Sequence, residues 1–273
     1  MRLLVSVFLL ASSVFAAERN KTNQRLDDAA TVFSEIMVAP DKGIPHDLLE
    51  KAHCVVIVPG LRKGAFVVGA QYGKGFVSCR ESSGKGWSAP GAVRVEGGSF
   101  GLQIGGSETD VVMLVMNDRG AAKLLSSQFT LGGEGEVAAG PVGRTASAET
   151  DAKMTAEILS WSRAHGVFAG ISLQGATLRQ DMDDNEALYH KRIENRDIVK
   201  GEVAPPPSAG RLLSVSNEVL RAAEIARGGY ARRNLMLRTI FIVLLVLWLL
   251  GMVTSYRSVA RLTSCWSWPY LCC

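Results

Sequence analysis

The sequence predicts an α+β fold, in which a compact, antiparallel, glycine-rich β core is flanked by short helices and followed by a single C-terminal membrane helix. The first supporting observation is that 22 of the 28 glycines fall between Gly60 and Gly175, interleaved with short apolar runs. Glycine in such surroundings is typical of tight turns, bulges and close backbone approaches. The second is an amphipathic helical pattern before this stretch, and the third is an almost purely apolar run over 239–254.

The first 16 residues have the architecture of a secretory signal peptide. Arg2 supplies the positive charge, residues 3–15 are apolar, and Ala16 offers a small residue at a cleavage point. The apolar run is shorter than the about 20 residues that span a bilayer. We therefore expect an exported, membrane-anchored protein, on the periplasmic or cell-envelope face if the source is bacterial. An uncleaved N-terminal anchor is the alternative.

The folded domain is expected over residues 17–200, beginning and ending with helices. Residues Gln24–Met37 place their apolar side chains on one helical face. Pro45 is well placed to start a second short helix over His46–Lys51. The domain closes with a helix over Asp181–Arg192, whose early acidic residues suit the positive end of the helix dipole.

The centre of the domain is predicted to be mainly strands. They run from Cys54 through Ile104 and again over Val111–Met116. Asn117 is a suitable N-cap for a helix that ends near Leu125, because its side chain accepts a hydrogen bond from a free backbone N–H. Residues 157–175 are expected to form a hairpin.

Four segments follow the domain: a proline-rich linker (201–210), a basic amphipathic helix (211–234), the membrane helix (235–254) and a short tail (255–273). The linker is expected to be extended and semi-rigid. The amphipathic helix has two possible locations, on the membrane surface or packed back on the domain or another copy.

The positive charge is concentrated in the C-terminal part of the chain. The whole chain carries a net charge of +4, whereas residues 205–273 alone carry +6. Arginines next to an apolar run favour contact with lipid headgroups. The arginines expected to contact the membrane are Arg227, Arg232, Arg233 and Arg238. Since no aromatic-rich basic stripe or zinc-finger spacing accompanies them, nucleic acid is not expected as a partner.

The motifs of enzymes and metal sites are incomplete in this sequence. The four histidines lack metal-ligand spacing. His53 and Cys54 are adjacent, so in a strand they point to opposite faces and do not converge as a nucleophile pair. Residues 181–185 begin like a calcium loop, but Glu186 and Arg192 stand where glycine and the bidentate glutamate belong. We therefore expect no catalysis, no cofactor and no metal, and a capped helix start at 181.

Two cysteines lie inside the domain. Cys54 and Cys79 pair if they occupy neighbouring strands and the domain folds in an oxidising compartment. Two unpaired, buried thiols are the alternative, because sequence separation does not show that the two residues meet.

Domain cations beside predicted turns are the candidates for binding lipid headgroups. Phosphate recognition requires positive charge and nearby backbone donors, and glycine turns supply both. The candidates are Arg62, Lys63, Lys74, Lys85 and Arg94.

Five short sequence motifs carry a family resemblance, because they occur in the same order as in that family: AHCVVIVPG (52–60), GWSAPGA (86–92), GGSFGLQIGGSETD (97–110), AGPVGR (139–144) and GVFAGISLQG (166–175). Together they resemble the SYLF domain, a lipid-binding family with yeast actin-binding relatives, over roughly residues 23–200. The resemblance is strongest to bacterial-type secreted members. It implies a non-catalytic module that binds phosphoinositides or other anionic lipids.

The function expected from the sequence is therefore non-catalytic binding of anionic phospholipid at a membrane surface. The alternative is an envelope scaffold or protein-interaction module, with an actin-type partner only in a eukaryote, whose lipid affinity is incidental.

Overall fold

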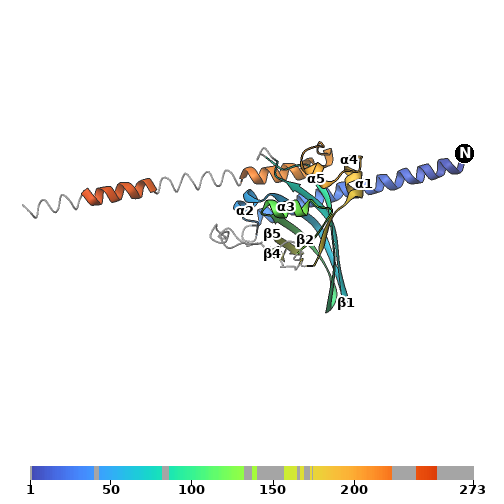
Figure 1. Cartoon of the computed structure of the whole chain (residues 1–273), viewed down its shortest axis with the longest axis horizontal. Coiled ribbons are helices and arrows are strands. Elements are labelled where there is room, and N and C mark those ends of the chain that lie inside the picture. Colours follow the sequence, from blue (N-terminus) through green and yellow to red (C-terminus); the bar gives the residue numbers. More distant parts are fainter. Residues whose placement is uncertain are drawn as a thin grey trace, which may run out of the picture. The chain divides into compact units, whose positions relative to one another are not determined.

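The computed structural model describes residues 2–39, 43–81, 86–131, 137–139, 157–164, 167–168, 173, 175–222 and 238–250. The chain divides into two compact units, Met1–Ala223 and Glu224–Cys273. The first unit combines helices with a seven-stranded sheet, which confirms the α+β class (Figure 1).

The N-terminal helix α1 (Arg2–Val38) is longer than expected. It includes the predicted helix Gln24–Met37 and continues without a break through the cleavage point expected after Ala16. The predicted apolar face is confirmed, since its side chains are fully buried at Leu26, Ala29, Ala30, Phe33 and Ile36. The second predicted helix is present as α2 (His46–Lys51).

Two long strands, β1 (Cys54–Cys79) and β2 (Gly91–Val115), pair antiparallel along almost their whole lengths. In Figure 1 they run out beyond the other elements of the domain as a curved ribbon. The sequence predicted a break before Val111, but β2 is continuous there. Gly105 and Gly106 of β2 pair with Ala65 and Gly64 of β1.

The remaining strands extend the sheet from the other edge of β2. β7 (Thr177–Gln180) and β5 (Ile158–Ala164) both pair antiparallel with β2, and β3 (Gln128–Thr130) pairs with β7. β4 (Val137–Ala139) lies parallel to β5. β6 (Val167–Phe168) pairs antiparallel with β5, which confirms the predicted hairpin for its described part.

The two ends of β1 meet. A disulfide joins Cys54 to Cys79, 25 residues apart. Near this link the second half of β1 crosses the first so closely that a Cβ on Gly75 would overlap the carbonyl oxygen of Ile57. Glycine is required at that crossing for steric reasons. Of the two alternatives, a disulfide or two unpaired thiols, the structure has the disulfide.

Both faces of β1 are buried over its first five residues, 54–58. Val55 and Ile57 of β1 pack with α1 in one apolar cluster, whereas Val56 and Val58 enter a second cluster with β2, β3 and β7. Alternation of side chains along a strand explains the division. The second cluster contains fully buried Phe129.

Three short helices complete the domain. Asn117 caps α3 (Asp118–Leu124), as predicted, by accepting a 2.7 Å hydrogen bond from the Gly120 N–H. Asp181 caps α4 (Met182–Tyr189) by accepting from the Asp184 N–H, which confirms a capped acidic helix start. α5 (Asn195–Val199) and the 3-10 turn η2 (Pro207–Ala209) follow.

The helix after the linker packs on the domain. Residues 210–222 are helical, and Leu212, Ser216 and Leu220 are buried. Asn217 accepts a 3.2 Å hydrogen bond from the backbone N–H of Trp87. Of the two locations predicted for this amphipathic segment, the described part takes the one against the domain.

The second unit is described over 238–250, which form a helix. Its large apolar side chains from Ile240 to Leu250 are all 45–65% exposed. Across the described residues, no helix combines the length and the apolar character that crossing a bilayer requires. The membrane helix predicted over 235–254 is therefore not supported.

Candidate functional site: a charged groove beside the first helix

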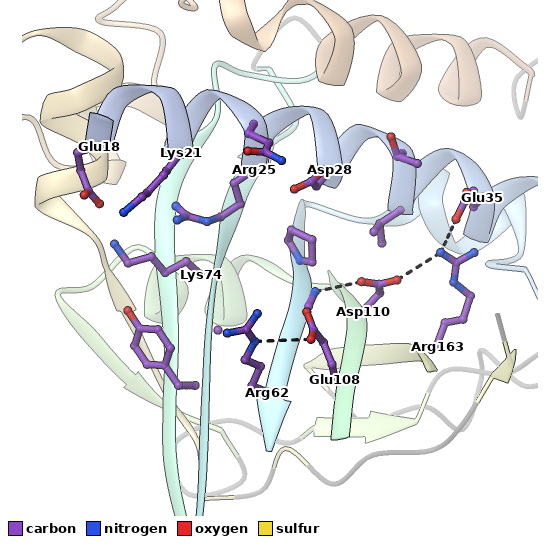
Figure 2. A pocket seen from close by; sticks show the side chains of 17 residues that line it. Glu18, Lys21, Arg25, Asp28, Glu35, Arg62, Lys74, Glu108, Asp110 and Arg163 are labelled. Atoms are coloured by element: carbon purple, nitrogen blue, oxygen red, sulfur yellow. Dashed lines mark hydrogen bonds and ion pairs between the residues drawn. The ribbon is translucent and has the colours of Figure 1, made fainter. Parts of the chain in front are cut away.

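A groove of about 1020 Å³ lies between α1 and the β1–β2 ribbon. Figure 2 shows its charged side chains directed into the space between the helix and the strands. Five acidic and five basic residues line it: Glu18, Asp28, Glu35, Glu108 and Asp110, and Lys21, Arg25, Arg62, Lys74 and Arg163.

Helix geometry explains why α1 supplies half of these charges. Residues three or four positions apart share one face of a helix. Lys21, Arg25 and Asp28 follow this spacing and face the groove, whereas Leu26 and Phe33 lie on the adjoining, buried face. The amphipathic pattern that docks α1 on the sheet therefore also presents a charged stripe to the groove.

The end of the groove near Lys21, its cationic end, gathers Lys21, Arg25 and Lys74, with Glu18 beside them (Figure 2). There Arg25 and Lys74 both contact the same carboxylate oxygen, Oδ2 of Asp184, at 2.6 and 3.2 Å. Lys74 also lies 2.9 Å from Asp181. The side chains of both aspartates are only 1% exposed. Two buried carboxylates therefore lie beneath the more exposed side chains of Arg25 and Lys74.

The ion pairs keep Lys74 charged. Burial alone lowers the pKa of Lys74, but its hydrogen bond to Asp181 and the charge of Asp184 raise the pKa overall. Thr22, on α1, donates a 2.9 Å hydrogen bond to the other oxygen of Asp184. Asp184 thus joins α1, β1 and α4 at the base of the cationic end.

Three residues of the groove lining are more open to solvent. Arg62 is 77% exposed and has a long contact, 3.6 Å, to Glu108. Lys21 is exposed, and no ion pair joins it to another described residue. Tyr72 is 48% exposed and is the large aromatic side chain that the described part of the domain leaves most open.

The other end of the groove carries most of the acidic residues. Asp110 accepts a 3.0 Å hydrogen bond from the Gly60 N–H and a 3.3 Å contact from Arg163. Arg163 also pairs with Glu35 on α1. Burial lowers the pKa of Arg163, but its hydrogen bonds to Glu35 and Asp110 more than offset this and raise the pKa. Arg163 therefore links α1, β2 and β5.

The structure brings two of the five predicted headgroup cations into the groove, Arg62 and Lys74. Lys63 is partly buried, which lowers the pKa of its ammonium, and it does not line the groove. Arg94 lies opposite Lys74 on β2, but it forms an ion pair with Glu96 at 3.1 Å and also lies outside the groove lining. Lys85 falls outside the described residues.

The arginines expected to contact the membrane are mostly not described. Arg227, Arg232 and Arg233 lie outside the described residues. Arg238 is exposed at the start of the described helix in the second unit.

The sequence interpretation missed Lys21, Arg25, Arg163 and Tyr72. The stripe on α1 was detectable, because charges at 18, 21, 25, 28 and 35 follow helical spacing on a face next to the apolar one. Arg163 and Tyr72 had no comparable signal, since their positions depend on strand register and on the folding back of β1.

Comparison with known proteins relates this domain to a family. Residues 96–219 match the model described as Ysc84, Las17-binding protein actin regulator. SH3 domain-containing YSC84-like protein 1 of Rattus norvegicus is 35% identical over 179 residues, which cover 65% of this chain and 52% of the relative.

Two fungal proteins are similar over the same extent. An SH3 domain-containing protein of Schizosaccharomyces pombe is 37% identical over 178 residues, 64% of this chain and 41% of the relative. LAS seventeen-binding protein 3 of Saccharomyces cerevisiae is 33% identical over 179 residues, 64% of this chain and 38% of the relative.

The chain spans about half the length, or less, of these curated relatives. The family match reaches residue 219 and so takes in most of the docked helix 210–222. The bacterial-type, secreted class inferred from the sequence is not confirmed. The resemblance to this family is supported, because residues 96–219 match its model and the relatives are 33–37% identical over 178 or 179 residues.

Proposed function

We propose that this chain is a non-catalytic module that binds anionic phospholipid at a membrane surface, with the headgroup phosphate at the cationic end of the groove. The observation that carries the proposal is the convergence of Lys21, Arg25 and Lys74 from two elements at one end of an open groove. Two of these three cations also contact the same carboxylate oxygen, which places their nitrogens close together.

The cations retain donors for a ligand. A guanidinium has five N–H donors and an ammonium has three. The contacts of Arg25 and Lys74 with Asp181 and Asp184 use only part of this capacity. A phosphate bound to Arg25 and Lys74 would accept charge-assisted hydrogen bonds, the strongest class available to these side chains.

Export and lipid anchoring are part of the same proposal. The Cys54–Cys79 disulfide supports maturation in an oxidising compartment. The helix 238–250 exposes apolar side chains all round, so we propose that it contacts the apolar phase of a membrane.

Vesicle co-sedimentation of the full chain tests the headgroup site. We expect stronger binding to vesicles that contain anionic phospholipid than to neutral vesicles, and weaker binding as salt shortens the screening length. A basic residue near an anionic surface contributes about 1 kcal/mol. The double variant Lys21→Glu/Arg62→Glu should therefore lose at least about tenfold in affinity for anionic vesicles.

The matched control is Arg119→Glu. Arg119 is also a highly exposed arginine with one long ion-pair contact, to Glu157 at 3.9 Å, but it lies outside the groove. Equal binding to neutral and anionic vesicles would contradict the proposal. An equal loss in the double variant and the control would also contradict it, because only a general charge effect would then remain.

A second candidate function is protein interaction. The matching family is described as a Las17-binding actin regulator, and a matching yeast relative is named a LAS seventeen-binding protein. On this alternative the domain acts as a scaffold with an actin-type partner, and lipid affinity is incidental. Co-sedimentation with filamentous actin in the absence of lipid, unaffected by Lys21→Glu/Arg62→Glu, would favour it.

A further inference from the structure

The ribbon of β1 and β2 extends beyond the other elements of the domain (Figure 1). β7 pairs with β2 over residues 93–96 and β5 pairs with it over 110–115, so among the described strands only β1 pairs with the stretch between them. We call the uncharged part of this two-stranded stretch the arm: residues 64–71 of β1 and 97–106 of β2. A ribbon of two strands is only marginally stable in water, so a surface that covers the arm would stabilise it.

The far end of the arm is its turning point. The two ends of β1 meet at the disulfide, and its halves are close again where a Cβ on Gly73 would overlap Leu61. Val67 lies six residues from each of these two residues, and the register of the ladder shifts between Phe66 and Val68. A strand rises about 3.3 Å per residue, so the turning point lies up to about 20 Å beyond the contact of Gly73 with Leu61.

Residue type changes in steps from the turning point to the base of the arm. Large apolar residues lie around the turning point, and they are Phe66, Val67 and Val68 on β1 and Phe100, Leu102 and Ile104 on β2. Glycine, alanine, serine and glutamine make up the rest of the arm. Charged residues and a tyrosine come next, at the base: Arg62, Lys63, Tyr72, Lys74, Glu96 and Glu108. The arm therefore has an apolar end, a neutral middle and a charged base.

These steps correspond to the layers of a membrane surface. Tyrosine is enriched where membrane meets water, and lysine and arginine are attracted to anionic headgroups. At the base of the arm, Tyr72 is 48% exposed and Arg62 is 77% exposed. Tyr72 is four residues from Val68, which is about 13 Å along a strand. An apolar end that lies below the headgroups therefore places the tyrosine among them.

The open edges of the ribbon limit how deeply it can enter a membrane. Unpaired backbone N–H and C=O groups have no partner in the hydrocarbon core, so an open ribbon of two strands does not cross it. Amphipathic helices bury their apolar faces about 5–10 Å into the boundary between headgroups and acyl chains. That depth corresponds to about two or three residues of a strand, which takes in the apolar residues around Val67.

A second copy of this chain fits the arm less well. A closed dimer has two-fold symmetry, so each edge of the arm would pair with the same edge of the other copy. Centred on the turning point, a pairing of β2 edges would place Glu96 opposite the second copy's Glu108. A pairing of β1 edges would place Arg62 opposite the second copy's Lys74. Like charges directly opposite each other destabilise a strand pair.

We propose that the arm inserts its apolar end shallowly into a membrane, with Tyr72 and Arg62 at the level of the headgroups. The inference rests on the proposed function for its partner, a membrane, and adds a second contact surface that requires no particular headgroup. Arg62, Tyr72 and Lys74 also line the groove, so insertion of the arm brings the strand side of the groove to the headgroup layer. The arm supplies apolar affinity for any bilayer, and the groove supplies the preference for anionic lipid.

A fluorescent label at the turning point tests the insertion. Replacing Cys265, Cys272 and Cys273 by serine in the full chain leaves only the two disulfide-bonded cysteines. An environment-sensitive fluorophore on Val68→Cys should then shift its emission to shorter wavelength on vesicles that contain phosphatidylserine, and brominated acyl chains should quench it. The matched control is Val38→Cys, at a valine that is 75% exposed and lies outside the arm, where neither change should occur.

A charge at the same position tests the contribution to affinity. Val68→Asp should weaken binding to phosphatidylcholine vesicles and to phosphatidylserine vesicles alike, by at least about tenfold, because a carboxylate is costly in the apolar phase. Val38→Asp introduces the same charge outside the arm and should leave binding nearly unchanged. Melting temperatures show whether both variants fold, and the label on Val68→Cys decides the question if Val68→Asp does not.

The outcomes separate the insertion from the proposed function. A label at position 68 that stays in water while the chain still prefers anionic vesicles would overturn the insertion alone. Quenching of that label by lipid without any anionic preference would overturn the proposed function alone, and binding to neither kind of vesicle would overturn both. An emission shift that needs no vesicles and grows with protein concentration would show pairing with a second copy, and equal losses in Val68→Asp and Val38→Asp would show a general charge effect. Either result would also overturn the insertion.

Discussion

Asp184 links three elements of the domain through its carboxylate. Its carboxylate accepts a hydrogen bond from Thr22 and forms ion pairs with Arg25 of α1 and Lys74 of β1. The backbone of Asp184 itself belongs to α4. Burying a carboxylate is unfavourable unless it is paired and hydrogen-bonded, and here both conditions are met. The same contacts hold Arg25 and Lys74 at the groove.

Replacing Asp184 by asparagine removes the charge but keeps the shape. We expect Asp184→Asn to lower the free energy of unfolding by about 3 kcal/mol, because two partly buried cations lose their shared carboxylate. The neighbouring Asp183→Asn is the control, since that side chain is 76% exposed and should change stability by less than about 0.5 kcal/mol. Urea unfolding measures the free energy of unfolding of both variants. Similar free energies for the two would contradict the role given to Asp184.

Tyr189 makes stability depend on pH in the alkaline range. Burial raises the pKa of its hydroxyl, which donates a 2.8 Å hydrogen bond to the carbonyl of Pro90. The unfolded chain ionises first, near pH 10, so the folded state loses stability as pH rises from there. Lys74, whose pKa is also raised, adds to this loss above pH 10.5.

The variant Tyr189→Phe isolates the tyrosine contribution. At pH 7 it should be about 1 kcal/mol less stable, because one hydrogen bond is lost. Above pH 10 its free energy of unfolding should fall less steeply than that of the unaltered chain. Urea unfolding from pH 7 to 11 measures both effects, and parallel curves above pH 10 would show that the tyrosine is not the titrating group.

At the scale of elements, the crossing of the two halves of β1 determines the shape of the sheet. A strand of 26 residues returns to its own start, where the disulfide joins its ends. The crossing requires the absence of a side chain at Gly75, and Gly73 is in similar close contact with Leu61 and Val58.

Alanine substitutions test this crossing directly. Gly75→Ala should destabilise the domain by at least about 3 kcal/mol, because the added Cβ overlaps backbone that has no room to move. Gly64→Ala, in the same strand, places its Cβ in open space and should be neutral or stabilising by about 0.5 kcal/mol. Equal thermal stability of the two variants would exclude the crossing.

Prediction from sequence succeeded where local pattern determines an element. The buried face of α1 and the caps Asn117 and Asp181 follow from residue spacing and side-chain chemistry alone. It failed for the continuity of β2 and left the location of 210–222 open, because both depend on contacts with distant residues. Gly105 and Gly106 look like a turn until their ladder partners on β1 are known.

For the whole molecule, the disulfide links stability to the redox state of the surroundings. Closing a segment of 25 residues stabilises the folded state by about 3.5 kcal/mol in the chain-entropy description. Adding a reductant should therefore lower the free energy of unfolding by about this amount. In Cys54→Ala/Cys79→Ala the reductant should have no effect, which provides an internal control.

Peptide mapping of the unreduced chain provides the direct measurement. The peptides that contain Cys54 and Cys79 should be recovered as one linked species that separates on reduction. Recovery of both as free thiols from chain produced in an oxidising compartment would contradict the pairing and remove its support for export.

Residue order was sufficient to predict a glycine-rich α+β domain that resembles this family, because periodicity, caps and short sequence motifs are local properties. It also supplied every charge in the groove. Folding alone decided which charges meet: α1 had to dock on the sheet and β1 had to return on itself before Lys21, Arg25 and Lys74 could share one end of a groove. The physical reason is that side chains far apart in the chain are brought together by apolar burial and strand register, which no short stretch of sequence specifies.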